Sequence, residues 1–166
     1  MKKITLAIIL VLCMFASLAI PGFASEAFAD QPVTDDDGNT IYYYDDGSYT
    51  VVSPVKVMPS SVTRAATHDV VGCVDAKNYS KSDKLNWVYT LCGHFTYEEG
   101  VSCVCTDSTY ETEIFTSGWK YYDASNTWSD NAAYGHINFK HKVLFVTNDS
   151  VVVDLRVRCD NYGNLY

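Results

Sequence analysis

Apolar and polar residues alternate along residues 85–97 (LNWVYTLCGHFTY) more regularly than elsewhere in the chain. The odd positions include Trp87, Leu91 and Phe95, whereas the even positions are mostly small or polar. Successive side chains of a β-strand point to opposite faces, so a period of two predicts a strand with one buried face. Residues 85–97 are therefore expected to form the central strand of the fold.

Similar alternation, or short apolar runs, marks further strands on both sides of this one, and polar or glycine-containing turns separate them. We expect strands over residues 40–44, 48–52, 70–79, 85–97, 101–110, 132–147 and 151–159, with short apolar pieces at 114–115 and 119–122. A loop carrying Trp128 is expected over 123–131, and a hairpin loop over 148–150. The predicted inward residues of the long strand 132–147 are Ala133, Gly135, Ile137, Phe139, Val143 and Phe145.

No segment after the N-terminal leader has the period of a helix. The fold class predicted from these elements is all-β, an antiparallel β-sandwich of about six or seven strands with an immunoglobulin-like outline, stapled by disulfides. This sandwich domain is expected over residues 67–166. Residues 30–66 are expected to form a Tyr/Asp-rich hairpin around Asp45-Asp46-Gly47 and then a linker, with an edge strand over 55–58 as the alternative.

The first 29 residues have the pattern of a secretory signal peptide. Two lysines precede an uncharged apolar run over residues 4–20, and small residues follow, which places cleavage after Ala24 or Ala29. The apolar run is short for a bilayer, so no stable membrane insertion is expected after cleavage. The mature protein is therefore expected to be secreted, either extracellular or loosely associated with the cell wall.

Net charge and residue spacing exclude several classes of function. The formal charge of −8 becomes −9 once residues 1–29 are removed, and a chain this acidic repels nucleic acid. The aspartates around Gly38 lack the ligand spacing of a calcium loop. His94, His136 and His141 do not share one strand parity, so we expect no metal site and no cofactor.

Five cysteines follow the leader, and in an exported chain they are first interpreted as disulfide partners. If the turn between the strands 70–79 and 85–97 is centred between Ser82 and Asp83, Cys73 and Cys92 lie directly opposite each other, within reach of a disulfide. Keeping Phe95 inward also turns Cys103 and Cys105 inward. Cys159, which is inward on the last strand, is then expected to bond to Cys105 or Cys103, leaving one buried thiol. The main rival pairing, Cys92–Cys105, needs a one-residue slip that would turn the apolar face outward.

Several short motifs resemble a family of small, uncharacterised secreted proteins from Gram-positive bacteria. They are Phe95-Thr96-Tyr97, Gly100, Cys105, Trp119-Lys120, Arg158-Cys159 and Asn161-Tyr162-Gly163, together with the Tyr-rich D-G-S segment at residues 42–49. The resemblance implies a β-sandwich and favours Cys105 as the partner of Cys159, because the single cysteine pair of the family maps to those two positions. Cys73, Cys92 and Cys103 are additional to that pattern. The resemblance implies no particular activity.

Catalysis finds little support in the sequence, and the protein is expected not to be an enzyme. Cys92 and His94 share a strand face as a thiol hydrolase would require, but Cys92 has a structural partner in Cys73. The G-x-S-x-G motif of serine hydrolases is absent. The acidic residues lie mostly at turns, which does not suit the paired carboxylates of a glycosidase.

Aromatic residues suggest a binding surface instead, because aromatic rings stack on the faces of sugars. The candidates are Trp119, Tyr121, Tyr122, Trp128 and Tyr134. Residues 118–122 (GWKYY) resemble a phrase of cell-wall-binding repeats, although the phrase occurs once here. The alternative is that these aromatics fill the core. We expect a non-enzymatic module that binds cell-wall glycan or a surface protein, with a small antibacterial or toxin-like effector as the alternative function.

Overall fold

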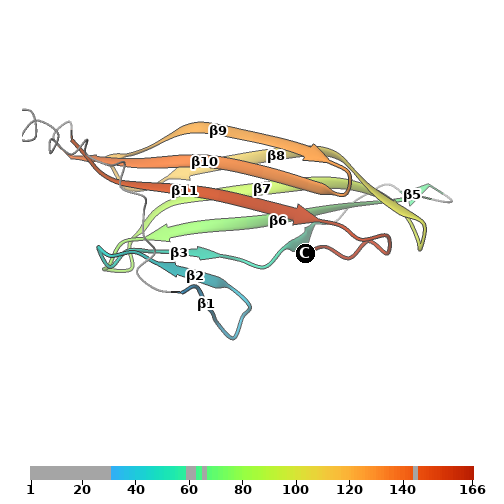
Figure 1. The fold of residues 1–166 in the computed structure, drawn as a ribbon, viewed down its shortest axis with the longest axis horizontal. Coiled ribbons are helices and arrows are strands. Elements are labelled where there is room, and N and C mark those ends of the chain that lie inside the picture. Colours follow the sequence, from blue (N-terminus) through green and yellow to red (C-terminus); the bar gives the residue numbers. More distant parts are fainter. Residues whose placement is uncertain (1–30, 59–62, 65–66, 144–145) are drawn as a thin grey trace, which may run out of the picture.

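The structure, a computed structural model, describes residues 31–58, 63–64, 67–143 and 146–166. These residues form two antiparallel β-sheets packed face to face, as the sequence predicts (Figure 1). The larger sheet contains β1 (Val33–Thr34), β2 (Thr40–Tyr43), β3 (Tyr49–Val52), β4 (Lys56–Met58), β5 (Thr63–Arg64), β6 (Thr67–Tyr79), β7 (Leu85–Glu98) and β8 (Ser102–Ile114). The smaller sheet contains β9 (Trp119–Ser129), β10 (Ala132–Val143) and β11 (Val146–Arg158).

The strands of the sandwich follow one another in sequence order. The larger sheet runs β1-β2-β3-β6-β7-β8, with β4 and β5 also paired to β6, and the smaller one runs β11-β10-β9. The chain therefore changes sheets once between the long strands, at the β8–β9 connection. None of the described residues form a helix long and apolar enough to cross a membrane.

The N-terminal hairpin forms as predicted around Asp45-Asp46-Gly47. Gly47 adopts a φ of 82°, which only glycine accepts readily, and this allows β2 and β3 to pair. β3 in turn pairs with β6, so the hairpin continues the larger sheet. The stretch interpreted as a linker also contributes two short strands to this sheet, β4 and β5, while its residues 59–62 and 65–66 lie outside the described residues.

The register of β6 and β7 agrees with the turn position inferred from the sequence. Cys73 lies opposite Cys92, and the two form a disulfide on the outer face of the larger sheet. The inner positions of β7 are buried, with Trp87 and Leu91 fully inaccessible to solvent. A bulge near the start of the strand adds Asn86, which is buried, to the otherwise regular pattern.

Among the long strands, β9 differs most from the prediction, which had only a short apolar piece at residues 119–122. Residues 123–131 were expected to be a loop, but β9 continues through Ser129 and pairs along its length with β10. The sequence is polar there because β9 is an edge strand. Asp123 has a positive φ of 51° and lies in a bulge opposite Ile137, which shifts the alternation of the residues that follow.

The hairpin between β10 and β11 also differs from expectation. Residues 148–150 were predicted to be its loop, but Asp149 pairs with His141 and Ser150 with Lys140, within the β10–β11 ladder. The connection therefore comes earlier, at residues 144–145, which lie outside the described residues together with the predicted inward position Phe145. The side chain of Val143 also lies outside them. The other predicted inward residues of β10 are buried.

The core lies between the two sheets and is aromatic at its centre. Trp87 on β7 stacks on Phe139 on β10, with ring centroids 3.8 Å apart and planes 7° from parallel. Gly135 allows a close approach of the sheets, because a Cβ there would collide with the hydroxyl of Tyr89 on β7. Burial raises the pKa of Tyr89 to about 12.

A polar cluster closes one side of this core. The side-chain amide of Asn86 donates to Oδ1 of Asn78 (2.8 Å), and that of Asn78 donates to Oγ1 of Thr50 (3.1 Å). All three residues are buried. The Tyr44 hydroxyl also donates to Thr50 (2.9 Å) within the N-terminal hairpin, and the bond from Asn78 to Thr50 ties this hairpin to β6.

Candidate functional site

The five aromatic residues proposed for ligand binding do not form one surface. Trp119 is buried and stacks on His141, with centroids 5.1 Å apart, so it belongs to the core. Tyr121 and Trp128 lie opposite Phe139 and Ala133, on the inner side of the edge strand β9, where each remains nearly half exposed. Tyr122 and Tyr134 belong to the opposite, outer face of the smaller sheet.

The outer face of β9, β10 and β11 is the surface with the richest chemistry. We call it the β9–β11 face. Lys140 and Lys142 place their ammonium groups 5.1 and 5.5 Å from the ring centroid of Tyr122. Nearby, the Ser150 hydroxyl donates to Oδ1 of Asn138 (3.1 Å). Cations, an aromatic ring and neutral hydrogen-bonding groups thus lie side by side on this face.

Charge is segregated between the two outer faces of the sandwich. The register turns five cations outward on the β9–β11 face, against one carboxylate, that of Asp154. The cations are Lys120, Lys140, Lys142, Arg156 and Arg158. The outer face of β6, β7 and β8 has the opposite balance, with one lysine, Lys77, against six carboxylates. These are Asp69, Asp75, Glu98, Asp107, Glu111 and Glu113. Alternation within β10 and β11 turns their cations outward, and the pairing of these strands joins them into one face.

Ser125, His136 and Asp154 lie in one row across the β9–β11 face, in the order of a hydrolytic triad. Asp154 Oδ1 lies 2.7 Å from Nδ1 of His136, but Ser125 makes no hydrogen bond to His136 among the described side chains. Backbone N–H groups of the central strand are committed to the sheet ladders, so the row offers no evident oxyanion hole. The row adds polar groups to the face.

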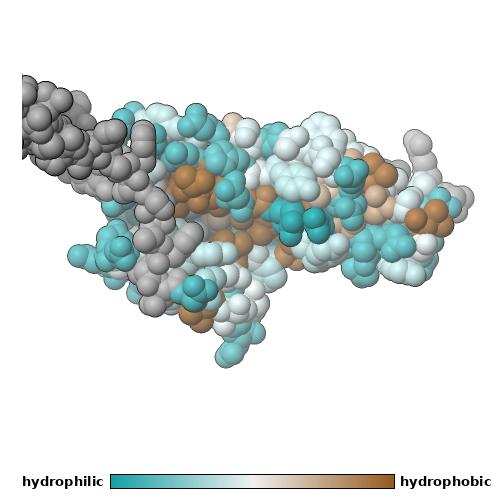
Figure 2. Space-filling view, in the orientation of Figure 1, coloured by the Kyte–Doolittle hydropathy of each residue, from teal (hydrophilic) through white to brown (hydrophobic). Residues whose placement is uncertain are grey.

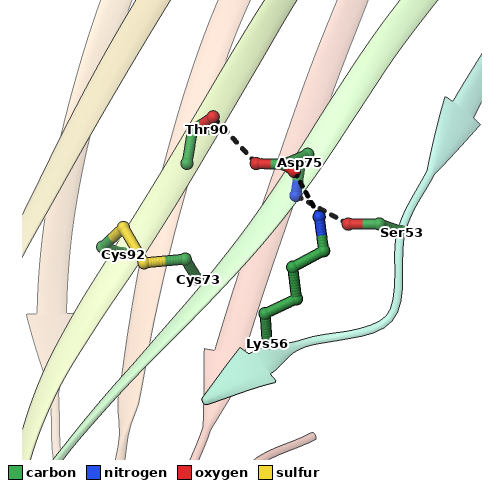
Figure 3. The surroundings of a disulfide bond; sticks show 6 residues. All are labelled: Ser53, Lys56, Cys73, Asp75, Thr90 and Cys92. Carbon is green, nitrogen blue, oxygen red and sulfur yellow. Dashed lines mark hydrogen bonds and ion pairs between the residues drawn. A yellow bond between two sulfur atoms is a disulfide. The ribbon is translucent and has the colours of Figure 1, made fainter. Parts of the chain in front are cut away.

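The Cys73–Cys92 disulfide lies beside a polar network on the opposite face (Figure 3). Asp75 accepts hydrogen bonds from Lys56 (2.9 Å) and from Thr90 (2.9 Å), and its backbone N–H donates to Ser53 Oγ (3.1 Å). Burial alone would raise the pKa of Asp75, but the bonds from Lys56 and Thr90 lower it below its ordinary value overall. Because Cys92 is in the disulfide, it cannot serve as a nucleophile beside His94.

This network predicts a specific loss of stability in acid. A carboxyl group whose pKa is lower in the folded state stabilises the fold above its unfolded pKa, near 3.8, and this contribution disappears as the pH falls through the folded value. We therefore expect urea denaturation to show a steeper loss of stability between about pH 5 and pH 2 for the wild type than for Asp75→Asn. Equal slopes for both proteins would contradict the assignment to Asp75. Asp36→Asn, in the turn between β1 and β2, is the matched control.

The remaining three cysteines are thiols, and the predicted Cys105–Cys159 bond is not formed. The Cys105 thiol points along its own strand, where it donates to the carbonyl oxygen of Asp107 (3.3 Å) across a bulge at Thr106. The Cys159 thiol donates to the carbonyl oxygen of Asp160 (3.3 Å), and it lies near enough to the Cys103 thiol to interact with it. Burial raises the pKa of all three thiols, so they are protonated and weakly nucleophilic at neutral pH.

No group of three or more metal-binding side chains converges anywhere in the described part of the chain. No family model, no curated protein and no solved structure matches this chain. The resemblance to secreted Gram-positive proteins therefore remains a prediction, and the function has to be inferred from the surfaces themselves.

Proposed function

We propose that this protein is a secreted, non-enzymatic module that binds an anionic cell-wall glycan through the β9–β11 face. The observation that supports this is the segregation of charge, which leaves a cationic face on a protein of net charge −8. An anionic polymer is attracted to this face and repelled by the acidic face behind it. Binding of this kind orients the protein on a surface.

The groups around the cations suit a polymer of sugars. Tyr122 is flanked by two lysines, so its ring and their charges can contact one repeating unit together. Asn138 and Ser150 on one side of it, and Thr127 beside Tyr134 further along, offer donors and acceptors for hydroxyl groups. The face spans three strands, which gives an extended chain room to lie across it.

The test is sedimentation with purified Gram-positive cell walls at increasing salt. We expect Lys140→Ala/Lys142→Ala to weaken binding by about tenfold, and sodium chloride to weaken wild-type binding in the same direction. Lys77→Ala/Lys81→Ala, which removes the same charge from the larger sheet and its turn, is the matched control and should bind as the wild type does. Trp128→Ala should also bind normally, because Trp128 lies off this face.

Other outcomes would overturn the proposal. Binding that survives removal of the lysine pair would exclude the β9–β11 face. Loss of binding after the walls are treated with protease would identify a surface protein as the partner. Growth inhibition of neighbouring cells without wall binding would favour the effector function.

A further inference from the structure

β11 is an edge strand, and most of the backbone N–H and C=O groups on its edge away from β10 have no partner among the described residues. Arg158 directs its N–H and C=O away from β10, because it exchanges both backbone hydrogen bonds with Tyr166. Residues of an antiparallel strand alternate in this respect, so Val152, Asp154 and Arg156 direct theirs to the same free side. Among the described residues no backbone partner exists for these three positions.

The larger sheet extends beyond this edge. β11 packs over β6 and β7, and among the described strands it makes no comparable contact with β1, β2 or β3. Figure 1 shows β3, β2 and β1 continuing past β11 with no strand of the smaller sheet in front of them. A hollow of about 240 Å³ lies between the N-terminal hairpin and β11. It is lined on one side by Val52, Thr50, Tyr44 and Tyr42, and on the other by residues 152–155 of β11. Figure 2 shows apolar atoms in this hollow, below a largely hydrophilic face.

The C-terminal tail already occupies the start of this fourth strand position. Tyr166 and Arg158 form a pair with hydrogen bonds of 2.8 and 3.0 Å, and Leu165 lies opposite Cys159. Leu165 turns inward, where it meets Val157 and Val55 above Gly72. The tail thus sets both the antiparallel direction and the inward side of any strand that continues it along β11.

We propose that an extended segment of a partner protein adds to β11 as a fourth, antiparallel strand, beside the tail and over β3. Branched apolar side chains at alternate positions of the segment fill the hollow against Val52 and Leu155. The outward positions between them carry an acidic residue opposite Arg156 and a basic residue opposite Asp154. This surface is distinct from the β9–β11 face and does not depend on the proposed glycan binding.

A second copy of this protein does not fit the position. Pairing two β11 strands edge to edge would place the projecting β1, β2 and β3 of each copy in the space that the other copy needs. A single extended segment meets no such obstacle. The unpaired edge of β11 is long and carries neither proline nor an inward charge between residues 151 and 158, and such edges readily accept another strand.

The experiment extends the tail itself. Six residues, Val-Glu-Val-Lys-Val-Thr, are added after Tyr166, and the same peptide with blocked ends is supplied separately to the unextended protein. We expect amide hydrogen exchange at Val152, Asp154 and Arg156 to be fast in the wild type, and about tenfold or more slower in the extended protein and with saturating peptide. The extended protein should also melt about 3 °C or more higher.

Two control extensions decide the interpretation. Glu-Val-Lys-Val-Thr-Val has the same composition but turns the valines outward, and Val-Pro-Val-Pro-Val-Thr lacks the two N–H groups that face β11. Neither should slow exchange. The proposal would be overturned if the three amides were already protected in the wild type without peptide. It would also be overturned if all three extensions protected them equally. Dimer formation by the unextended protein with these amides protected would identify a second copy as the occupant.

Discussion

Replacing Phe139 with alanine should lower the free energy of unfolding by about 3–5 kcal/mol. Phe139 is fully buried, and its ring stacks on Trp87 from the opposite sheet at a centroid distance of 3.8 Å. The substitution removes the principal contact between β7 and β10 and leaves a cavity that rigid strands on both sides cannot close. Since a domain of this size is stable by only about 5–15 kcal/mol, a large part of its stability would be lost.

Urea denaturation followed by tryptophan fluorescence measures this loss, and Trp87 supplies a signal at the altered position. Phe115→Ala is the matched control, because Phe115 is about half exposed and its loss should cost no more than about 0.5 kcal/mol. A change below about 1 kcal/mol for Phe139→Ala would show that the sheets are not held together through this pair.

The β6–β7 hairpin could be predicted from the sequence because two independent signals agree there. The alternation fixes which residues face inward, and the polar turn fixes the register, so the Cys73–Cys92 disulfide followed from both. The bulge at Asn86 could not be predicted. It is compatible with burial because the Asn86 amide donates a hydrogen bond to Asn78, and the alternation does not show which side chains will become neighbours. The sandwich as a whole followed from the number of alternating segments.

β9 and the start of β11 were missed because edge strands do not need apolar residues on both sides. The run at 123–131 is polar because one face of β9 meets solvent, while Asp123 occupies a bulge that hides the period of two. Residues 148–150 have the composition of a turn, but turn-forming residues are also tolerated in an exposed ladder. In both places the local composition is typical of a loop or turn, but pairing with β10 makes the residues part of a strand.

The candidate site could be predicted only in part for the same reason. The aromatics of β9 were grouped by their closeness in the chain, but the bulge at Asp123 and the inward position of Trp119 distribute them over different surfaces. Alternation within each strand turns the cations of β10 and β11 outward. These cations lie on one face only because their strands are neighbours in the sheet. The order of strands in a sheet cannot be predicted from the alternation within a single strand.

Cys103 and Cys159 should form a disulfide when the folded protein is exposed to oxidised glutathione. The Cys103 and Cys159 thiols lie near enough to interact, whereas the Cys105 thiol donates to the carbonyl oxygen of Asp107 on its own strand. The two thiols lose their hydrogens to oxidised glutathione, which is reduced to two molecules of the thiol form. Because the raised pKa of Cys159 leaves little thiolate, the reaction should be slow at neutral pH and faster as the pH rises.

The bond would join β8 to the end of β11 and should stabilise the protein by about 3–4 kcal/mol in the chain-entropy model. Mass spectrometry of proteolytic fragments should find residues 103 and 159 crosslinked, and urea denaturation before and after oxidation should give the gain. Cys105→Ser should oxidise and gain stability as the wild type does, while Cys103→Ser should do neither. Oxidation of Cys103→Ser but not of Cys105→Ser would restore the Cys105–Cys159 pairing that the family resemblance implies. It would require the start of β8 to move relative to β11.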